Sequence, residues 1–221
     1  MSTAGTFDET LITSKRDLAA WMEAGCKPKS DWRLGTEHEK FGFRRSDHAP
    51  LPYDGDGPTV RKMLEGMAQR FGWEPMMEGE AVLALARDGA TVALEPGGQF
   101  ELSGAPLENV HQACNETHRH LDEVRQVADD IGAGFLGLGF APDWDLADMP
   151  IMPKARYQIM RSYMPRVGRL GREMMFRTCT IQVNLDFASE ADMARKLRVA
   201  LALQPVATAL FANSPFAGGR P

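Results

Sequence analysis

The sequence predicts an α+β fold, with an antiparallel or mixed sheet and helices packed on one face. Two observations support this class. Short β-prone runs are joined largely by hairpin turns, and long amphipathic segments lie among them without a regular alternation of single strands and helices. The chain has 221 residues, 43% hydrophobic and 25% charged, which is enough for one large core. We expect residues 1–221 to belong to one domain.

Helical periodicity predicts most of the helices, and capping residues or glycines mark several of their ends. They cover residues 14–25, 60–72, 106–131, 154–164 and 189–213, the last interrupted at Pro205. Residues 1–10 are predicted to be a loose arm. Leu18, Trp21 and Met22 should form the apolar face of the first helix. In the third, His118 and His120 diverge, which argues against a zinc site.

The first predicted strand runs through residues 33–43 and is unusually polar. Glu37 and Glu39 share one face with two phenylalanines, because alternate side chains of a strand point the same way. His38 and Lys40 take the other face. Two carboxylates two residues apart repel each other unless a metal ion or a cationic group lies between them. The alternative interpretation is a solvated edge strand.

Acidic residues also border a tight turn in the middle of the chain. Residues 82–95 form a predicted hairpin with Asp88-Gly89 at its turn. Glu95 ends it, Pro96-Gly97-Gly98 turns the chain, and Gln99 and Glu101 share one face of the next strand. The glycines permit a ligand to approach the backbone closely.

Two later runs also predict strands. Residues 135–140 indicate a buried strand, and residues 176–187 alternate cleanly between polar and apolar side chains. Gln182 and Asn184 lie on the polar face of this second strand. A polar face on a central strand is costly unless it is wet or lines a site.

Composition narrows the classes of function. The net charge of −5 gives no electrostatic footprint for nucleic acid. No apolar run is long enough to span a bilayer, and the first twenty residues lack a signal-peptide core. Cys26, Cys114 and Cys179 are odd in number and widely spaced, which predicts reduced thiols and a cytoplasmic location.

Three predicted strands thus present carboxylate or amide side chains, a donor set that suits Mg²⁺ with room for phosphates. Metal ions that bridge phosphates promote phosphoryl transfer. The chain has no P-loop motif, so an ATP site would use metal and sheet. Arg156, on the basic helix 154–164, is either part of a solvated face or part of an anion-binding wall.

Five motifs, in order along almost the whole chain, resemble glutamate–cysteine ligase of the plant and proteobacterial type. They are Thr36-Glu37-His38-Glu39-Lys40-Phe41-Gly42-Phe43, Glu95-Pro96-Gly97-Gly98-Gln99-Phe100-Glu101-Leu102-Ser103-Gly104, Met152-Pro153-Lys154-Ala155-Arg156-Tyr157, Arg177-Thr178-Cys179-Thr180-Ile181-Gln182-Val183-Asn184-Leu185-Asp186-Phe187 and Phe211-Ala212-Asn213-Ser214-Pro215-Phe216. Each motif alone is weak, and together they are specific.

The resemblance implies a fold and a reaction. The fold is a funnel of antiparallel sheet with outer helices, similar to the glutamine synthetase catalytic domain. The reaction joins glutamate to cysteine with ATP, through a γ-glutamyl phosphate, as the first step of glutathione synthesis. The implied site residues are Glu37, Glu39, Glu95 and Glu101 as Mg²⁺ ligands, Gln99, Gln182 and Asn184 around the nucleotide, and Arg156 and Arg177 as contacts for a substrate carboxylate or phosphate.

The family continues well beyond residue 221, so the chain resembles the N-terminal part of a single catalytic domain. The missing part would add strands and substrate-binding arginines. Two alternatives remain open: a truncated relative that binds a ligand or partner without turnover, and another ATP-dependent carboxylate–amine ligase or guanidino enzyme on the same fold. We expect a homo-oligomer or pairing with the missing half.

Overall fold

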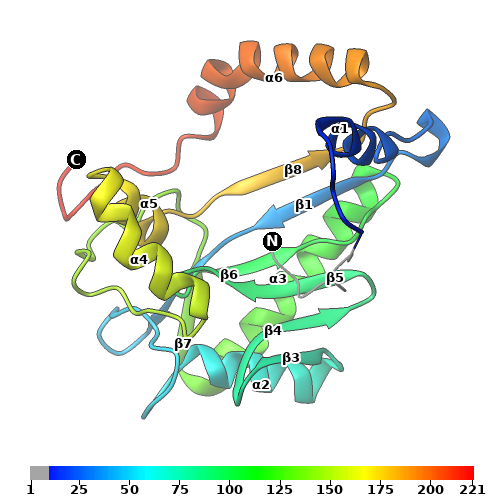
Figure 1. The fold of residues 1–221 in the computed structure, drawn as a ribbon. Helices are drawn as coiled ribbons and strands as arrows, with labels where there is room; N and C mark the ends of the chain where they lie inside the picture. Colours follow the sequence, from blue (N-terminus) through cyan, green and yellow to red (C-terminus); the bar gives the residue numbers. More distant parts are fainter. Residues whose placement is uncertain (1–9) are drawn as a thin grey trace.

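A six-stranded antiparallel sheet forms the centre of the computed structural model, which describes residues 10–221 (Figure 1). The expected arm at residues 1–10 lies outside this range except for Thr10. The strand order is β3-β4-β5-β6-β1-β8. Their bounds are β1 Leu34–His38, β3 Glu74–Glu78, β4 Ala81–Arg87, β5 Ala90–Leu94, β6 Phe100–Ser103 and β8 Ile181–Leu185. A smaller sheet pairs β2 Phe41–Arg44 with β7 Ala133–Leu136.

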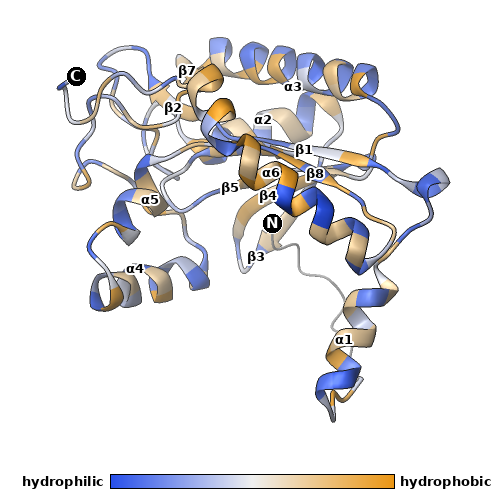
Figure 2. Cartoon of the chain, turned by 90° about the horizontal axis from the view of Figure 1, so that it is seen from above, coloured by the Kyte–Doolittle hydropathy of each residue, from blue (hydrophilic) through white to orange (hydrophobic). Residues whose placement is uncertain are grey.

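Two helices cover one face of the large sheet. Viewed from above, α2 (Val60–Phe71) and α3 (Val110–Ile131) lie on one side of the strands, and α4 (Ala155–Val167) and α5 (Gly171–Arg177) lie on the other (Figure 2). The remaining helices are α1 (Lys15–Ala24), a 3₁₀ turn (Lys29–Asp31) and α6 (Glu190–Phe211). The predicted α+β class is therefore confirmed, but helices lie on both sides of the sheet and not on one face as predicted.

Helix α2 illustrates how local sequence and core packing agree. The side chain of Thr59 caps it by accepting a hydrogen bond from the backbone of Lys62, and Gly72 ends it in the left-handed region at φ 71°. Four of its apolar residues, Val60, Met63, Leu64 and Met67, are fully buried. Burial of such side chains contributes about 1.5–3 kcal/mol each, so packing rather than propensity holds the helix.

The predicted hairpin is also confirmed. Strands β4 and β5 pair directly, and Asp88 and Gly89 form the turn with φ values of 52° and 81°. Positive φ at both central residues is typical of the two-residue hairpin turns whose twist matches that of the flanking strands.

The predicted strand at residues 33–43 is two strands in two sheets. Strand β1 ends at His38, and β2 begins at Phe41 and pairs with β7. At the junction, the backbones of Lys40 and Phe100 exchange two hydrogen bonds. Phe41 consequently leaves the face of Glu37 and packs edge-on against Trp144. The prediction failed because alternation along a run does not reveal a change of pairing partner.

The polar strand predicted at residues 176–187 is shorter and lies at the edge of the sheet. Residues 171–177 are helical, and β8 covers only Ile181–Leu185. Its apolar residues Ile181, Val183 and Leu185 are 72%, 59% and 64% exposed. The buried strand expected at residues 135–140 likewise becomes β7 at Ala133–Leu136.

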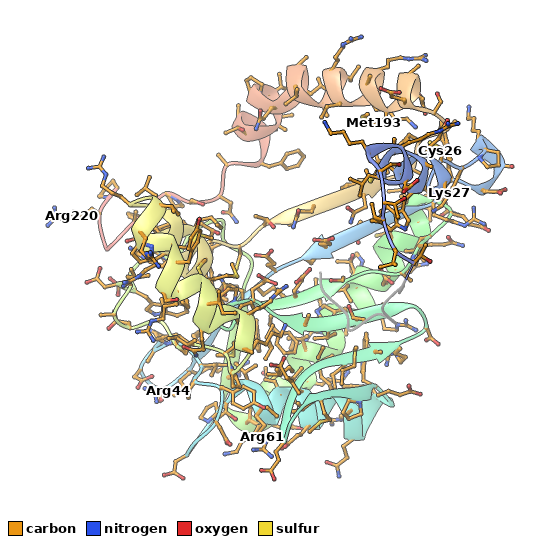
Figure 3. All side chains as sticks on the ribbon, viewed as in Figure 1. Cys26, Lys27, Arg44, Arg61, Met193 and Arg220 are labelled. Atoms are coloured by element: carbon orange, nitrogen blue, oxygen red, sulfur yellow. The ribbon has the colours of Figure 1, made fainter. Side chains whose placement is uncertain are left out.

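Helices α1 and α6 form as predicted but do not bury their apolar faces. Neither has a buried residue, and Leu18, Trp21 and Met22 are exposed. Helix α6 runs through Pro205 without the expected interruption. Its first turns adjoin the segment that includes Cys26 and Lys27 (Figure 3): Lys196 donates to the carbonyl of Asp186, whose carboxylate accepts from Lys27.

Among residues 10–221, no helix combines the length and the apolar character that crossing a membrane requires.

Candidate active site

The open face of strands β1 and β8 brings Glu37 together with two amides. Glu37 lies opposite Gln182 in the strand register, and Asn184 lies two residues further on the same face. Gln182 Nε2 donates to Glu37 Oε2 at 2.9 Å, and Asn184 Nδ2 donates to Glu37 Oε1 at 3.0 Å. Both carboxylate oxygens are therefore held in place, and the amide oxygens stay available as ligands.

Glu39 is held by a residue that the sequence analysis did not select. The backbone N–H of Thr180 donates to Glu39 Oε2 at 3.1 Å, and its hydroxyl donates to Oε1 at 3.0 Å. Thr180 Oγ1 also accepts from Gln182 Nε2 at 3.1 Å. The signal for Thr180 was its place on the same alternating polar face as Gln182 and Asn184.

Glu101 and Glu95 extend the acidic face on the β6 side. Glu101 is almost fully buried and accepts from the Ser103 hydroxyl at 2.8 Å. Burial, and then the negative charges of Glu101 and Glu39, raise the pKa of Glu95 to about 7. Burial also raises the pKa of Glu39. The carboxylates of β1, β6 and the turn are thus close enough to repel one another.

The donor chemistry of this face fits Mg²⁺. In the described part of the chain, no three acidic, histidine or cysteine side chains converge on one ion position. Mg²⁺ does not require such a cage, because proteins hold it through one or two carboxylates while water and phosphate oxygens complete the octahedron. A divalent cation would offset the repulsion that contributes to the raised pKa values of Glu39 and Glu95.

Gln99 has a different environment from the one expected for a nucleotide contact. It is 1% exposed, and its amide bonds to backbone. Oε1 accepts from Gly97 N at 2.8 Å, and Nε2 donates to the carbonyls of Met175 and Thr178 at 3.1 and 2.9 Å. Gln99 therefore ties the Gly97-Gly98 turn to the end of α5.

The glycines of that turn serve packing rather than ligand approach. A Cβ on Gly97 would lie 2.6 Å from the carbonyl oxygen of Phe176, and Gly98 has φ 82°. The protein's own backbone occupies the space that was expected for a ligand.

Arg156 lies beside Glu95, supported by two further residues of its motif. Its Nη2 donates to the Tyr157 hydroxyl at 3.1 Å and lies 3.8 Å from Glu95 Oε1. Lys154 Nζ donates to the carbonyl of Leu94 at 2.9 Å and to the Tyr157 hydroxyl at 3.3 Å. The guanidinium also stacks over the Tyr157 ring at 4.8 Å. Sequence reasoning had not singled out Lys154 and Tyr157.

Arg177 is not joined to the acidic face by any hydrogen bond or ion pair among residues 10–221. It is 7% exposed, donates to Glu173 at 2.9 Å, and lies over the Phe140 ring. The two arginines that were predicted together therefore occupy different environments.

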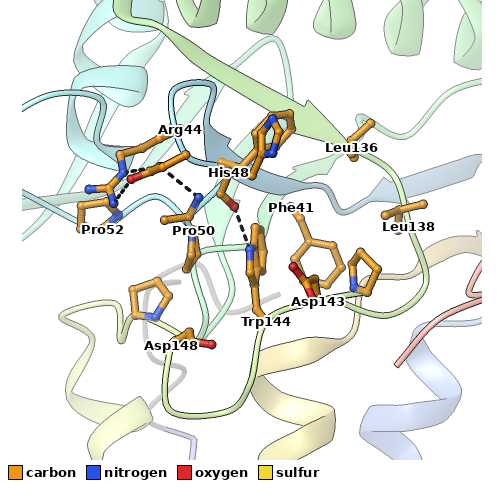
Figure 4. Close-up of a pocket in the computed structure, with 15 residues that line it drawn as sticks. Phe41, Arg44, His48, Pro50, Pro52, Leu136, Leu138, Asp143, Trp144 and Asp148 are labelled. Carbon is orange, nitrogen blue, oxygen red and sulfur yellow. Dashed lines mark hydrogen bonds and ion pairs between the residues drawn. The ribbon is translucent and has the colours of Figure 1, made fainter. Parts of the chain in front are cut away.

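A cavity of about 850 Å³ lies away from these carboxylates (Figure 4). Phe41, Trp144 and His48 line it, and Arg44 and Asp47 pair with each other at its wall. None of its lining residues is among the described residues that carry a buried polar atom without a partner. The acidic face is the better candidate for chemistry, because its carboxylates lie close enough to one another to raise the pKa of Glu95.

The fold and the site together define the class of this protein. It is an α+β protein in which carboxylate and amide side chains form a candidate divalent-cation site on one face of an antiparallel sheet. The model of Glutamate-cysteine ligase family 2 (GCS2) matches residues 33–221. The chain belongs to this family.

Curated relatives agree with this assignment. The chain is 58% identical over 208 residues to "Glutamate--cysteine ligase, chloroplastic" of Nicotiana tabacum, and 57% identical over 208 residues to the protein of that name in Arabidopsis thaliana. It is 58% identical to "Glutamate--cysteine ligase A, chloroplastic" of Oryza sativa subsp. japonica. Each alignment covers 94% of this chain and only 39–42% of the relative. The chain thus spans about two fifths of their length.

These names contradict the cytoplasmic location expected from the sequence, because these relatives are all described as chloroplastic. The expectation rested partly on cysteine usage. Cys26, Cys114 and Cys179 are free thiols. Reduced thiols are compatible with any reducing compartment, so they do not single out the cytoplasm.

Proposed function

We propose that this chain supplies the N-terminal part of a catalytic domain that joins the γ-carboxylate of glutamate to the amine of cysteine with ATP. Family membership and the names of the relatives support the reaction. The observation that carries it is that Glu37, Glu39, Glu95 and Glu101 lie on or beside one face of an antiparallel sheet, where their charges interact. A funnel similar to that of glutamine synthetase is the proposed form of the complete domain.

Mg²⁺ would neutralise phosphate charge on this face. Pairs among Glu37, Glu39, Glu95 and Glu101 would hold such ions, and the carbonyl oxygens of Gln182 and Asn184 remain available as further ligands. The protein's contribution is orientation: the amides and Thr180 fix the carboxylates before a ligand arrives, so little reorganisation is needed. Gln99 is proposed to act indirectly, by fixing the turn between Glu95 and Glu101.

Arg156 is proposed to hold the α-carboxylate of glutamate. Its guanidinium is partly exposed, with a side chain 41% accessible, and Tyr157 fixes its plane. The γ-carboxylate oxygen would then attack the terminal phosphorus of ATP and release ADP. The cysteine nitrogen would attack the resulting acyl carbon, release phosphate and lose a proton. Arg156 acts through position, because it keeps the attacking oxygen in line.

A second candidate function is binding without turnover. It is favoured by the exposed apolar residues of β8 and by α6, which has no buried residue. An edge strand with free backbone groups is a template for another strand. In this alternative the covering partner is a second copy of this chain, whereas in the ligase the polypeptide equivalent to the remaining three fifths of the relatives would cover the same surfaces.

Calorimetric titration of the chain with ATP, with and without Mg²⁺, tests the site. We expect binding that requires Mg²⁺ and weakens in both Glu37→Gln and Glu101→Gln, which keep the shape and lose the charge. Glu74→Gln, an exposed position on β3, is the control. Unchanged affinity in both site variants would reject the metal assignment.

Product analysis then separates the two functions. Formation of ADP and γ-glutamylcysteine from glutamate and cysteine supports the ligase. The same assay is repeated after the chain is mixed with the C-terminal part of a relative. Binding of MgATP without formation of product in both cases supports the alternative.

A further inference from the structure

A cavity of about 520 Å³ lies behind the acidic face, between α3 and the junction of the two sheets. His38 and Lys40 line it from the junction, and Thr117 and His120 line it from α3. His38 Nε2 lies 3.3 Å from Thr117 Oγ1. Side chains alternate along β1, so His38 points to the opposite face from Glu37. Glu39 also borders the cavity, but the hydrogen bonds of its carboxylate run to Thr180.

His120 is a buried polar residue that lines this cavity. Its side chain is 2% exposed, and neither ring nitrogen has a hydrogen-bond partner among residues 10–221. The ring stacks on Phe100 with centroids 6.4 Å apart and planes 16° apart, which sets its orientation. A buried polar group without a partner destabilises a fold, so its presence calls for a partner that binds there.

Lys40 adds a cation with spare donors. It is 4% exposed, and its Nζ donates to the carbonyl of His38 at 3.0 Å. An ammonium group has three N–H donors, and one hydrogen bond joins this one to residues 10–221, so two donors remain for another partner. Burial, and then the charges of Lys40, His38 and Arg87, lower the pKa of His120, so its ring is neutral and carries one N–H.

We propose that this cavity binds a small organic monoanion that carries one carboxylate on an apolar body. One carboxylate oxygen would accept from Lys40 and the other from the His120 ring. The apolar body would lie against Leu121, Val124 and Phe135, which line the same space. Arg45 and Arg125 also line the cavity, but both are exposed and pair with Asp129 and Asp122. Lys40 is therefore the one buried cation among the described lining residues, and it balances one negative charge, whereas the phosphate dianion would keep an unpaired charge and gain nothing from the apolar wall. This inference does not depend on the proposed ligase activity.

The test uses the 221-residue chain with ¹³C-labelled histidine, and benzoate and inorganic phosphate as probes. We expect benzoate to shift the Cε1–H resonance of His120 saturably and phosphate to leave it in place. His120→Phe, which keeps a ring against Phe100, and Lys40→Met should each weaken benzoate binding at least tenfold, the loss expected for one charged hydrogen bond. His111→Gln, exposed on the same helix, is the matched control and should change nothing.

The resonance of His120 is identified by its loss in His120→Phe, or in His120→Gln if the first variant does not fold. The shift in the unsubstituted chain is then sufficient on its own. The proposal would be overturned if benzoate, added up to about 10 mM, caused no saturable shift of this resonance. That concentration is tenfold above a Kd of about 1 mM. Equal affinity for phosphate would overturn the assignment to an organic anion.

Discussion

Glu95→Gln is expected to stabilise the folded chain above neutral pH and to leave its stability unchanged near pH 4. The folded protein holds the pKa of Glu95 at about 7, against an ordinary value of 4.5, because the carboxyl is buried and faces Glu101 and Glu39. Between these two values the folded state binds a proton that the unfolded state lacks. The free energy of unfolding therefore falls as pH rises through this window, and the deficit is complete above pH 7.

The size of the effect follows from the same difference. A pKa raised from 4.5 to about 7 corresponds to about 3 kcal/mol between the two protonation states. The side chain is 26% exposed, so solvent screening only partly reduces this value. Glutamine keeps the shape of the protonated carboxyl and cannot ionise. The substituted chain should therefore keep at pH 8 the stability that the unsubstituted chain has only in acid.

Urea unfolding at pH 4, 6 and 8 measures this difference. We expect the gain in unfolding free energy from Glu95→Gln to grow from near zero at pH 4 to about 3 kcal/mol at pH 8, a midpoint shift on the order of 1 M urea. Glu74→Gln, exposed on β3, should show no such trend. A difference that does not depend on pH, or destabilisation at pH 8, would refute the reasoning and show that the contact with Arg156 outweighs the carboxylate repulsion.

Three further predictions concern the site, the surface and the core. In a full-length protein, Arg156→Ala should raise the glutamate requirement about a hundredfold and the ATP requirement little, since one charged hydrogen bond of about 2–3 kcal/mol is lost; kinetics with each substrate varied separately decide this. The chain alone should associate through the exposed residues of β8, and a well-behaved monomer in sedimentation velocity would contradict this. Glu123→Ala should destabilise by about 3–5 kcal/mol in urea unfolding, because Glu123 Oε1 and Oε2 pair with the largely buried Arg87 at 2.7 and 3.0 Å; unchanged stability would show that Arg87 finds another partner.

The sequence predicted the candidate site residues as a group, but not the contacts that each of them makes. The strand motifs selected Glu37, Gln182 and Asn184, and the structure joins these three by hydrogen bonds. Gln99 matched the same motifs, but its amide is hydrogen-bonded to backbone groups. A motif identifies which residues matter, but the direction of a buried side chain depends on neighbours that are far away in the sequence.

The sequence by itself determined the elements whose physics is local. Thr59 and Gly72 bound α2, and Asp88-Gly89 turns the hairpin, because caps and positive-φ turns depend on a few adjacent residues. Only the tertiary structure decided that the run at residues 33–43 divides between two sheets and that β8 lies at an edge. Strand pairing joins residues more than a hundred positions apart, such as Glu37 and Gln182, and the period of a strand is the same whether its neighbours are present or not.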